Sequence, residues 1–293
     1  YNRGPEIVNS ATDSYGYVIR WQGVQTAKAV GELLQQGIIL RIADAPFEVS
    51  GQQFDRGSVI ILKTSNNAFT GSLWNIVSKI CNDNKVKLNA VTSGFVDKGY
   101  DFGSDHVHVL RAPKVALLTG EGVGSNAAGE VWHFFEKQLN YPLTLINAND
   151  AGRADWKNID VLIMPDGNFR FLNDKDAADN FKEWVMKGGR VVAMEGAVSQ
   201  LAKLEWITAK LKKGDDSDDK KDKDPYTLIK RFDNRERDGI SNTTPGSIYK
   251  VELDVTHPLA FGYPSYYYTL KMDNNIYEFL KDDGWNVGVI KKD

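Results

Sequence analysis

A short segment in the second half of the chain has the pattern of a turn that presents a reactive side chain. Residues 186–190 (MKGGR) predict the end of a helix, because two glycines follow a basic last turn. An apolar run at 191–194 predicts a buried parallel strand, after which Glu195 and two small residues turn into a helix that begins near Val198. In a nucleophile elbow of this strand–turn–helix kind, Ser or Cys occupies the turn. Glu195 stands there instead, so the pattern indicates an elbow that has lost its nucleophile.

Other polar residues follow the strands that we expect beside this one. Residues 114–119 predict a buried strand, and residues 161–164 predict another. Ligands of parallel sheets bind beyond the carboxyl ends of the strands. The candidate pocket residues at these ends are Glu121, Asp166, Asn168 and Glu195. Their carboxylates could act as a general base or bind a cation, but ordinary solvated loops carry the same residues, and we prefer that interpretation.

A glycine-rich turn at residues 120–124 (GEGVG) raises the question of phosphate binding. Such a turn between a strand and a helix, here expected from Ser125 to Asn140, can hold phosphate through backbone N–H groups. The spacing differs from G-x-G-x-x-G, and no G-K-[ST] follows. Nucleotide binding is therefore not favoured, although a sensor of small anions remains open as a functional class.

Two histidine patterns could bind a metal. His106 and His108 alternate with valines on one face of an extended segment, where they could chelate a metal, but a solvated strand face is preferred because no third ligand is near in the sequence. His133 and Glu136 have the H-x-x-E spacing of carboxypeptidase zinc ligands, with His257 as a distant third. Because they fall inside a predicted helix, we interpret the match as chance and expect His133 to pack within that helix.

Composition argues against several classes of partner. The net charge is −3 with both signs mixed along the chain, which gives no electrostatic reason to expect nucleic acid or an anionic membrane. The single cysteine, Cys81, excludes an internal disulfide and a cysteine-based zinc site, and its apolar helix face predicts a buried, inert thiol. No apolar run approaches the roughly 18 residues that cross a bilayer, and we expect neither a membrane span nor a signal peptide within this sequence. Since the chain starts at Tyr1, we expect a fragment or a processed product.

The first part of the chain predicts a small α+β domain. After a lead-in at residues 1–15, residues 16–93 show the order β-α-β-β-α-β, which is typical of a ferredoxin-like fold. The expected strands are at 17–21, 38–42, 47–49, 57–62 and 86–91, with 47–49 and 57–62 as a hairpin-like pair, and the helices are at 24–36 and 69–83. Residues 94–113 are glycine-rich, end in proline and read as a connector.

Residues 114–293 predict a larger α/β domain. Strands that include 143–146 and 161–164 alternate with helices, of which one is expected at 173–187, and this favours a parallel sheet covered on both faces. A charged insertion at about 210–226 buries too little to become ordered. Strands are expected at 247–253, 266–270 and 285–290. Tyr266–Tyr268 predict core or interface packing, with a sugar or peptide platform as the alternative.

Several sequence motifs resemble one family over nearly the whole chain. They are RGSVII at 56–61, DFGSDHVHVLRAPKVALLTG at 101–120, GEVWHFFE at 129–136, VLIMPDGN at 161–168 and HPLAFGYP at 257–264. Together they resemble the C-terminal region that follows the catalytic domain in certain bacterial zinc carboxypeptidase-like (metallocarboxypeptidase family) proteins. The second half also looks like the class I glutamine amidotransferase-like fold, which has a flavodoxin-like sheet. The resemblance implies a zinc-binding peptidase domain upstream and a periplasmic or secreted location.

These features favour a noncatalytic accessory region. It would support the upstream peptidase domain of the same chain or bind a peptide or cell-wall ligand, with no cofactor of its own and zinc in the upstream domain. The alternative is a hydrolase or amidotransferase-like enzyme, or a small-ligand-binding module, that uses the pocket above the sheet. Acyl transfer there would need a thiolate or alkoxide backed by a base, and Glu195 supplies neither.

Overall fold

The computed structural model describes residues 14–212, 231–237, 246–271 and 273–291. These form two compact units, Tyr1–Ala197 and Val198–Asp293. Most of the expected lead-in and most of the expected charged insertion lie outside the described residues. No helix within the described ranges is long and apolar enough to cross a membrane.

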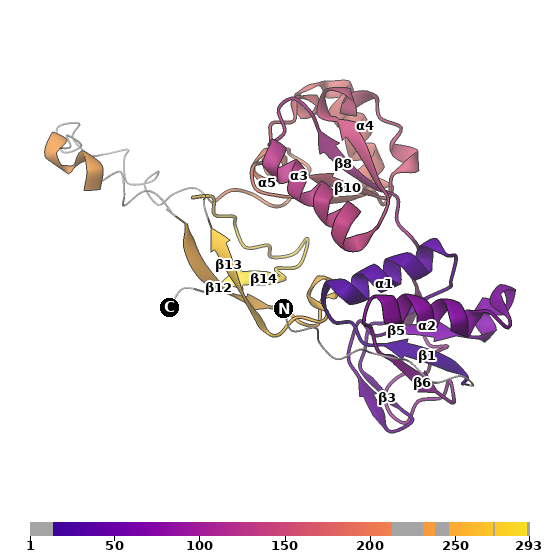
Figure 1. Ribbon diagram of the computed structural model, residues 1–293. Coiled ribbons are helices and arrows are strands. Elements are labelled where there is room, and N and C mark those ends of the chain that lie inside the picture. Colours follow the sequence, from indigo (N-terminus) through magenta and orange to yellow (C-terminus); the bar gives the residue numbers. More distant parts are fainter. Residues whose placement is uncertain (1–13, 213–230, 238–245, 272, 292–293) are drawn as a thin grey trace. The chain divides into compact units, whose positions relative to one another are not determined.

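The first unit begins with a five-stranded antiparallel sheet in the order β6-β1-β5-β2-β7 (Figure 1). Its strands are β1 (Gly16–Ile19), β2 (Arg41–Ala43), β5 (Val59–Leu62), β6 (Leu88–Val91) and β7 (Val107–Val109). Helices α1 (Gly23–Gln35) and α2 (Leu73–Asp83) contact each other and cover one face of this sheet (Figure 1). A separate two-stranded hairpin joins β3 (Phe47–Val49) to β4 (Gln52–Phe54).

Alternation along β5 explains the two cores of this sheet. Val59 and Ile61 pack toward the helices, in a cluster that also contains the buried Cys81. Ile60 and Leu62 point to the opposite face and pack with the hairpin and with Phe102. A strand that is buried on both faces reads as a continuous apolar run, as VIIL does here.

Two expectations for this region need correction. The hairpin forms between β3 and β4, whereas residues 59–62 join the large sheet between β1 and β2. The connector expected at 94–113 contributes strand β7, which pairs with β2. Three-residue strands such as β4 and β7 are too short for alternation to identify them.

The second part of this unit is a four-stranded parallel sheet in the order β11-β10-β8-β9. Its strands are β8 (Val115–Thr119), β9 (Leu143–Asn147), β10 (Val161–Met164) and β11 (Arg190–Ala193), and its helices are α3 (Ser125–His133) and α4 (Lys175–Met186). The short helix α5 (Gly196–Leu201) begins in this unit and continues into the second. Helices α3 and α4 flank the sheet (Figure 1). The long helix expected to reach Asn140 changes at Phe134 into a π-helix that ends at Leu139. The N-cap of α3 is Gly124, and Ser125 is the first residue of that helix.

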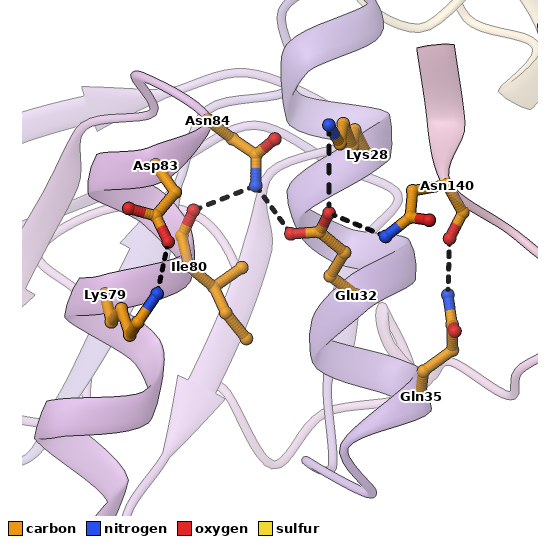
Figure 2. Close-up of polar contacts among 8 residues, drawn as sticks. All are labelled: Lys28, Glu32, Gln35, Lys79, Ile80, Asp83, Asn84 and Asn140. Atoms are coloured by element: carbon orange, nitrogen blue, oxygen red, sulfur yellow. Dashed lines mark hydrogen bonds and ion pairs between the residues drawn. The ribbon is translucent and has the colours of Figure 1, made fainter. Parts of the chain in front are cut away.

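A small polar network joins α1 to the end of this π-helix (Figure 2). Asn84 Nδ2 donates to Glu32 Oε2 at 2.7 Å, and Asn140 Nδ2 donates to Glu32 Oε1 at 3.4 Å. Gln35 Nε2 donates to the carbonyl of Asn140 at 3.1 Å. Asn140 has a φ of +51°, a left-handed conformation that asparagine adopts more readily than most residues. A single carboxylate, that of Glu32, thus binds groups from two helix ends.

The second unit contains a three-stranded antiparallel sheet in the order β13-β12-β14. Its strands are β12 (Ser247–Leu253), β13 (Tyr266–Lys271) and β14 (Gly288–Ile290). The side chains of Tyr266, Tyr267 and Tyr268 are exposed, contrary to the core packing expected for them. Tyr266 and Tyr268 lie on the same face of β13, with ring centroids 5.8 Å apart.

Candidate functional site

The turn at Glu195 has the backbone of an elbow. Strand β11 ends at Ala193 and helix α5 begins at Gly196, so the connection is two residues long. Glu195 has a φ of +48°, in the left-handed region that non-glycine residues rarely occupy. Strain of this kind is often kept where a side chain must be presented outward. The turn presents the exposed carboxylate of Glu195.

Asp166 holds the residue after the turn. The backbone N–H of Gly196 donates to Asp166 Oδ1 at 3.0 Å. A Cβ atom at position 196 would lie 2.5 Å from that same oxygen, so only glycine fits without a shift. One carboxylate oxygen of Asp166 therefore has a structural role, as a partner of a backbone donor.

The glycine-rich turn at residues 120–124 packs against the loop that follows β10. Gly124 N–H donates to the carbonyl of Asp166 at 2.8 Å, and Asn168 N–H donates to the carbonyl of Gly122 at 2.7 Å. A Cβ atom at Gly122 would meet the Asn168 carbonyl at 2.9 Å. The glycines thus allow two loops to approach closely, and the N–H of Gly124 is used within the protein.

The four residues predicted for this pocket come from three loops, and the side chains of Glu121 and Asp166 have different partners. Glu121 is exposed, accepts a hydrogen bond from Asn149 Nδ2 at 3.4 Å and lies 3.9 Å from Arg170. Within the described residues, no hydrogen bond or ion pair joins the side chains of Glu121, Asp166 and Glu195 to one another. The arrangement provides an acidic edge, without a nucleophile placed on the turn.

A groove that the sequence did not reveal lies beside this edge. It has a volume of about 460 Å³ and is lined by residues from the segments that follow β9 and β10. The lining includes Asn149, Arg153, Arg170, Phe171, Asp174 and Asn180. Its arginines come from 3-10 turns whose positions depend on tertiary packing, so no spacing in the sequence indicates that they share a groove.

Both residues of the H-x-x-E pattern are exposed, so His133 does not pack as expected. His133 is the last residue of α3, and Glu136 lies in the π-helix, where its carboxylate pairs with Lys137 at 2.6 Å. His257 caps a short 3-10 helix by accepting a hydrogen bond from Leu259 N at 3.2 Å. Over the part of the chain that the structure describes, no three His, Cys, Asp or Glu side chains are arranged to hold a metal ion.

His106 and His108 share one carboxylate. His106 Nδ1 lies 2.7 Å from Asp44 Oδ1, and His108 Nε2 lies 2.8 Å from Asp44 Oδ2. The ring of Tyr100 stacks on His106 with centroids 3.6 Å apart. Both histidines do lie on one side of the segment, as the alternation predicted, but Asp44 could not be found from the sequence because it meets them only when β7 pairs with β2.

This cluster predicts an acid-sensitive contribution to stability. Burial raises the pKa of Asp44, but hydrogen bonds from His108 and His106 outweigh it and hold the pKa below its ordinary value of 3.8. A depressed pKa in the folded state adds stability above the unfolded-state pKa, and this is lost as the pH falls through the folded-state value. Asp44→Asn should therefore lower the free energy of unfolding at about pH 6 and change it less at about pH 2. Urea unfolding at both values tests this, with Asp105→Asn as the exposed control, and an equal loss at both values would contradict it.

Comparisons with known proteins leave the function open. No family model matches the chain, and no curated protein matches it. Among solved structures, the chain is similar to the crystal structure of a ThuA-like protein from Bacteroides uniformis, with 16% sequence identity and a TM-score of 0.32. The similarity covers 56% of this chain and 59% of the ThuA-like protein, so this chain spans less than two thirds of the length of the ThuA-like protein. The established architecture is mixed α/β with a four-stranded parallel sheet.

Proposed function

We propose that the chain is a noncatalytic accessory region of a zinc carboxypeptidase-like protein, in which an amidotransferase-like domain has lost its nucleophile. The observation that carries this proposal is Glu195 at the left-handed position of the strand–turn–helix connection. Acyl transfer at such a turn requires a thiolate or an alkoxide. A carboxylate there leaves a scaffold that can bind or support a partner.

The strand orders support the fold families that this proposal assumes. Counted along the chain, the order β9-β8-β10-β11 corresponds to 2-1-3-4, as in flavodoxin-like sheets. In the other sheet, the order β6-β1-β5-β2, with all neighbours antiparallel, fits a split βαβ arrangement to which β7 and the β3–β4 hairpin are added. Both are topological arguments and carry no chemistry of their own.

The most informative experiment identifies the polypeptide that contains this chain in cells. Antibodies raised against the chain would be used to isolate the native protein, followed by intact-mass measurement, peptide sequencing and zinc analysis. We expect a longer polypeptide with a peptidase domain upstream and stoichiometric zinc. A polypeptide without a peptidase domain would overturn the proposal.

The single cysteine of the sequence, Cys81, allows a second test, because a thiolate could come only from this residue. Cys81 is fully buried, and burial raises the pKa of its thiol to about 12. We expect this thiol to react at least about a hundredfold more slowly with a disulfide reagent in the native protein than in denaturant, because the thiolate is the reactive form. Rapid labelling of the native protein would show an accessible thiolate and would contradict an inert role.

A small-ligand-binding role is the second candidate. The groove beside the acidic edge favours it, because Arg153 and Arg170 line it together with Asp174 and Asp176, which suits a polar ligand that carries a negative group for an arginine. Titration with citrate and with phosphate would test this role. Saturable binding that is weakened by Arg170→Met, with exposed Arg190→Met as the control, would support it.

A further inference from the structure

A larger groove lies in the first sheet region, away from the residues discussed above. It has a volume of about 730 Å³ and lies at the ends of β5 and β6, beside the loop at residues 101–104. Its lining includes Arg41, Leu62, Thr64, Asp101, Phe102 and Ser104. Leu62 and Phe102 belong to the core on the face opposite α1 and α2, so the groove opens on the side of the sheet without helices. Pockets of about 300–1,000 Å³ are typical of small-molecule sites.

Arg41 lines this groove as a cation. Its Nε atom is buried, and it makes no hydrogen bond. Within the described part of the chain, no carboxylate lies within the 4.0 Å that defines an ion pair with it. Buried donors almost always have a partner, and leaving one unpaired costs free energy. The unpaired Nε–H of Arg41 therefore calls for an acceptor that the described residues do not supply.

A second unpaired polar atom belongs to Ser104, another residue that lines the same groove. Ser104 Oγ is buried without a hydrogen-bond partner, although the backbone of Ser104 is held in place by a bond from its N–H to the carbonyl of Asp101. The hydroxyl and the guanidinium come from different elements, one from a loop and the other from β2. Two independent orphan groups on one groove are more than a local irregularity of the backbone would produce.

Asp101 supplies the opposite charge. Its Oδ1 accepts a hydrogen bond from Val96 N at 2.8 Å, which fixes the carboxylate at the wall of the groove. Arg41 and Asp101 line one groove without pairing with each other. A doubly charged phosphate would meet the negative charge of Asp101, whereas a ligand with both signs would satisfy both side chains.

We propose that this groove binds a small zwitterion of the amino-acid or dipeptide class. The carboxylate of the ligand pairs with the Arg41 guanidinium and accepts from Ser104, because a planar guanidinium matches a carboxylate with two parallel hydrogen bonds. The ammonium group of the ligand faces Asp101. Hydroxyl groups of Thr64 and Ser65 are available for the rest of the molecule.

Calorimetric titration of the whole chain with glycylglycine and with the standard L-amino acids tests this inference. We expect saturable binding of at least one of them at concentrations up to about 10 mM. For that ligand, Arg41→Met and Asp101→Asn should each weaken binding about tenfold or more, since each removes a charge-assisted hydrogen bond. The matched exposed controls, Arg111→Met and Asp105→Asn, should leave binding unchanged. The N-acetylated ligand lacks the ammonium group and should bind the unaltered protein as weakly as the free ligand binds Asp101→Asn. The amide of the ligand lacks the carboxylate and should bind as weakly as the free ligand binds Arg41→Met.

Thermal melting separates loss of binding from loss of folding. Without ligand, Arg41→Met should melt at the same temperature as the unaltered protein or higher, because it removes an unpaired buried donor. The inference is overturned if no zwitterion in the panel binds. It is also overturned if Arg41→Met is folded and binds as tightly as the unaltered protein, or if the N-acetylated form binds equally well. None of these outcomes depends on the accessory function proposed for the Glu195 turn.

Discussion

Replacement of Phe181 by alanine is expected to lower the free energy of unfolding by about 3–5 kcal/mol. Phe181 lies on α4 and is fully buried. Its ring contacts three other aromatic rings at centroid distances of 5.6–5.9 Å, those of Trp156, Phe171 and Trp184. Removing it opens a cavity that these large rigid rings cannot fill. Denaturant unfolding followed by tryptophan fluorescence measures the effect in this part of the molecule.

Phe95 offers a matched control for this prediction. It is the same residue type, but 80% of its surface is exposed, so Phe95→Ala removes little buried area. We expect the free energy of unfolding to change by less than about 0.5 kcal/mol. Equal losses in the two variants would show that the aromatic cluster does not hold α4 to the 3-10 turns that carry Trp156 and Phe171.

The second large effect is expected at the Glu195 turn. Gly196→Ala would place a Cβ atom 2.5 Å from Asp166 Oδ1, the oxygen that accepts the Gly196 N–H. The carboxylate must move away, which weakens this hydrogen bond and leaves the Gly196 N–H without its acceptor. We expect a loss of about 1 kcal/mol in the free energy of unfolding.

Gly129→Ala is the corresponding control. Gly129 lies on the exposed side of α3, and an added Cβ atom there meets nothing within 4 Å. Alanine is the better helix former, so this variant should gain about 0.5–1 kcal/mol. The two glycine-to-alanine changes are thus predicted to have opposite signs, and a gain at position 196 would refute the close approach of Asp166.

The parallel sheet could be predicted well from the sequence because its strands are continuous apolar runs between glycine-rich turns. Strand β10 was predicted with its observed bounds, and β8 and β9 each differ by one residue. The turn residue Glu195 was also placed correctly between β11 and α5. The strand before it was expected to be buried, but β11 is an edge strand, and Val192 on it is exposed. These features are local, so the residues that define them lie next to one another in the chain.

Features that depend on pairing between distant segments could not be predicted. Strand β7 has only three residues, and it becomes a strand because β2 offers it an edge. For the same reason, nothing in the sequence connects Asp44 with His106 and His108, which lie about sixty positions away. The tyrosines of β13 were predicted to be buried because they form an aromatic run. In the structure their side chains are exposed, because the described neighbours do not cover them.

The sequence predicted at which edge of the sheet the candidate residues lie, but it did not predict which groups their side chains contact. The carboxyl ends of parallel strands must share one edge of the sheet, so Glu121, Asp166 and Glu195 fall on the expected side. Which groups they bind is decided by loop conformation. Asp166 turns toward the Gly196 N–H, and Glu121 turns toward Asn149 and Arg170. Loop conformation is tertiary information that single-sequence patterns lack.

The central claim is that the side chain on the elbow turn does not catalyse acyl transfer. It is tested most directly by measuring ammonia release from L-glutamine and nitrophenol release from p-nitrophenyl acetate, with the unaltered chain and with Glu195→Ala at equal concentrations. We expect both proteins to give the rate of the buffer alone, because a carboxylate at this turn offers no thiolate or alkoxide. Turnover by the unaltered chain that is clearly above the buffer rate and is abolished by Glu195→Ala would contradict the claim.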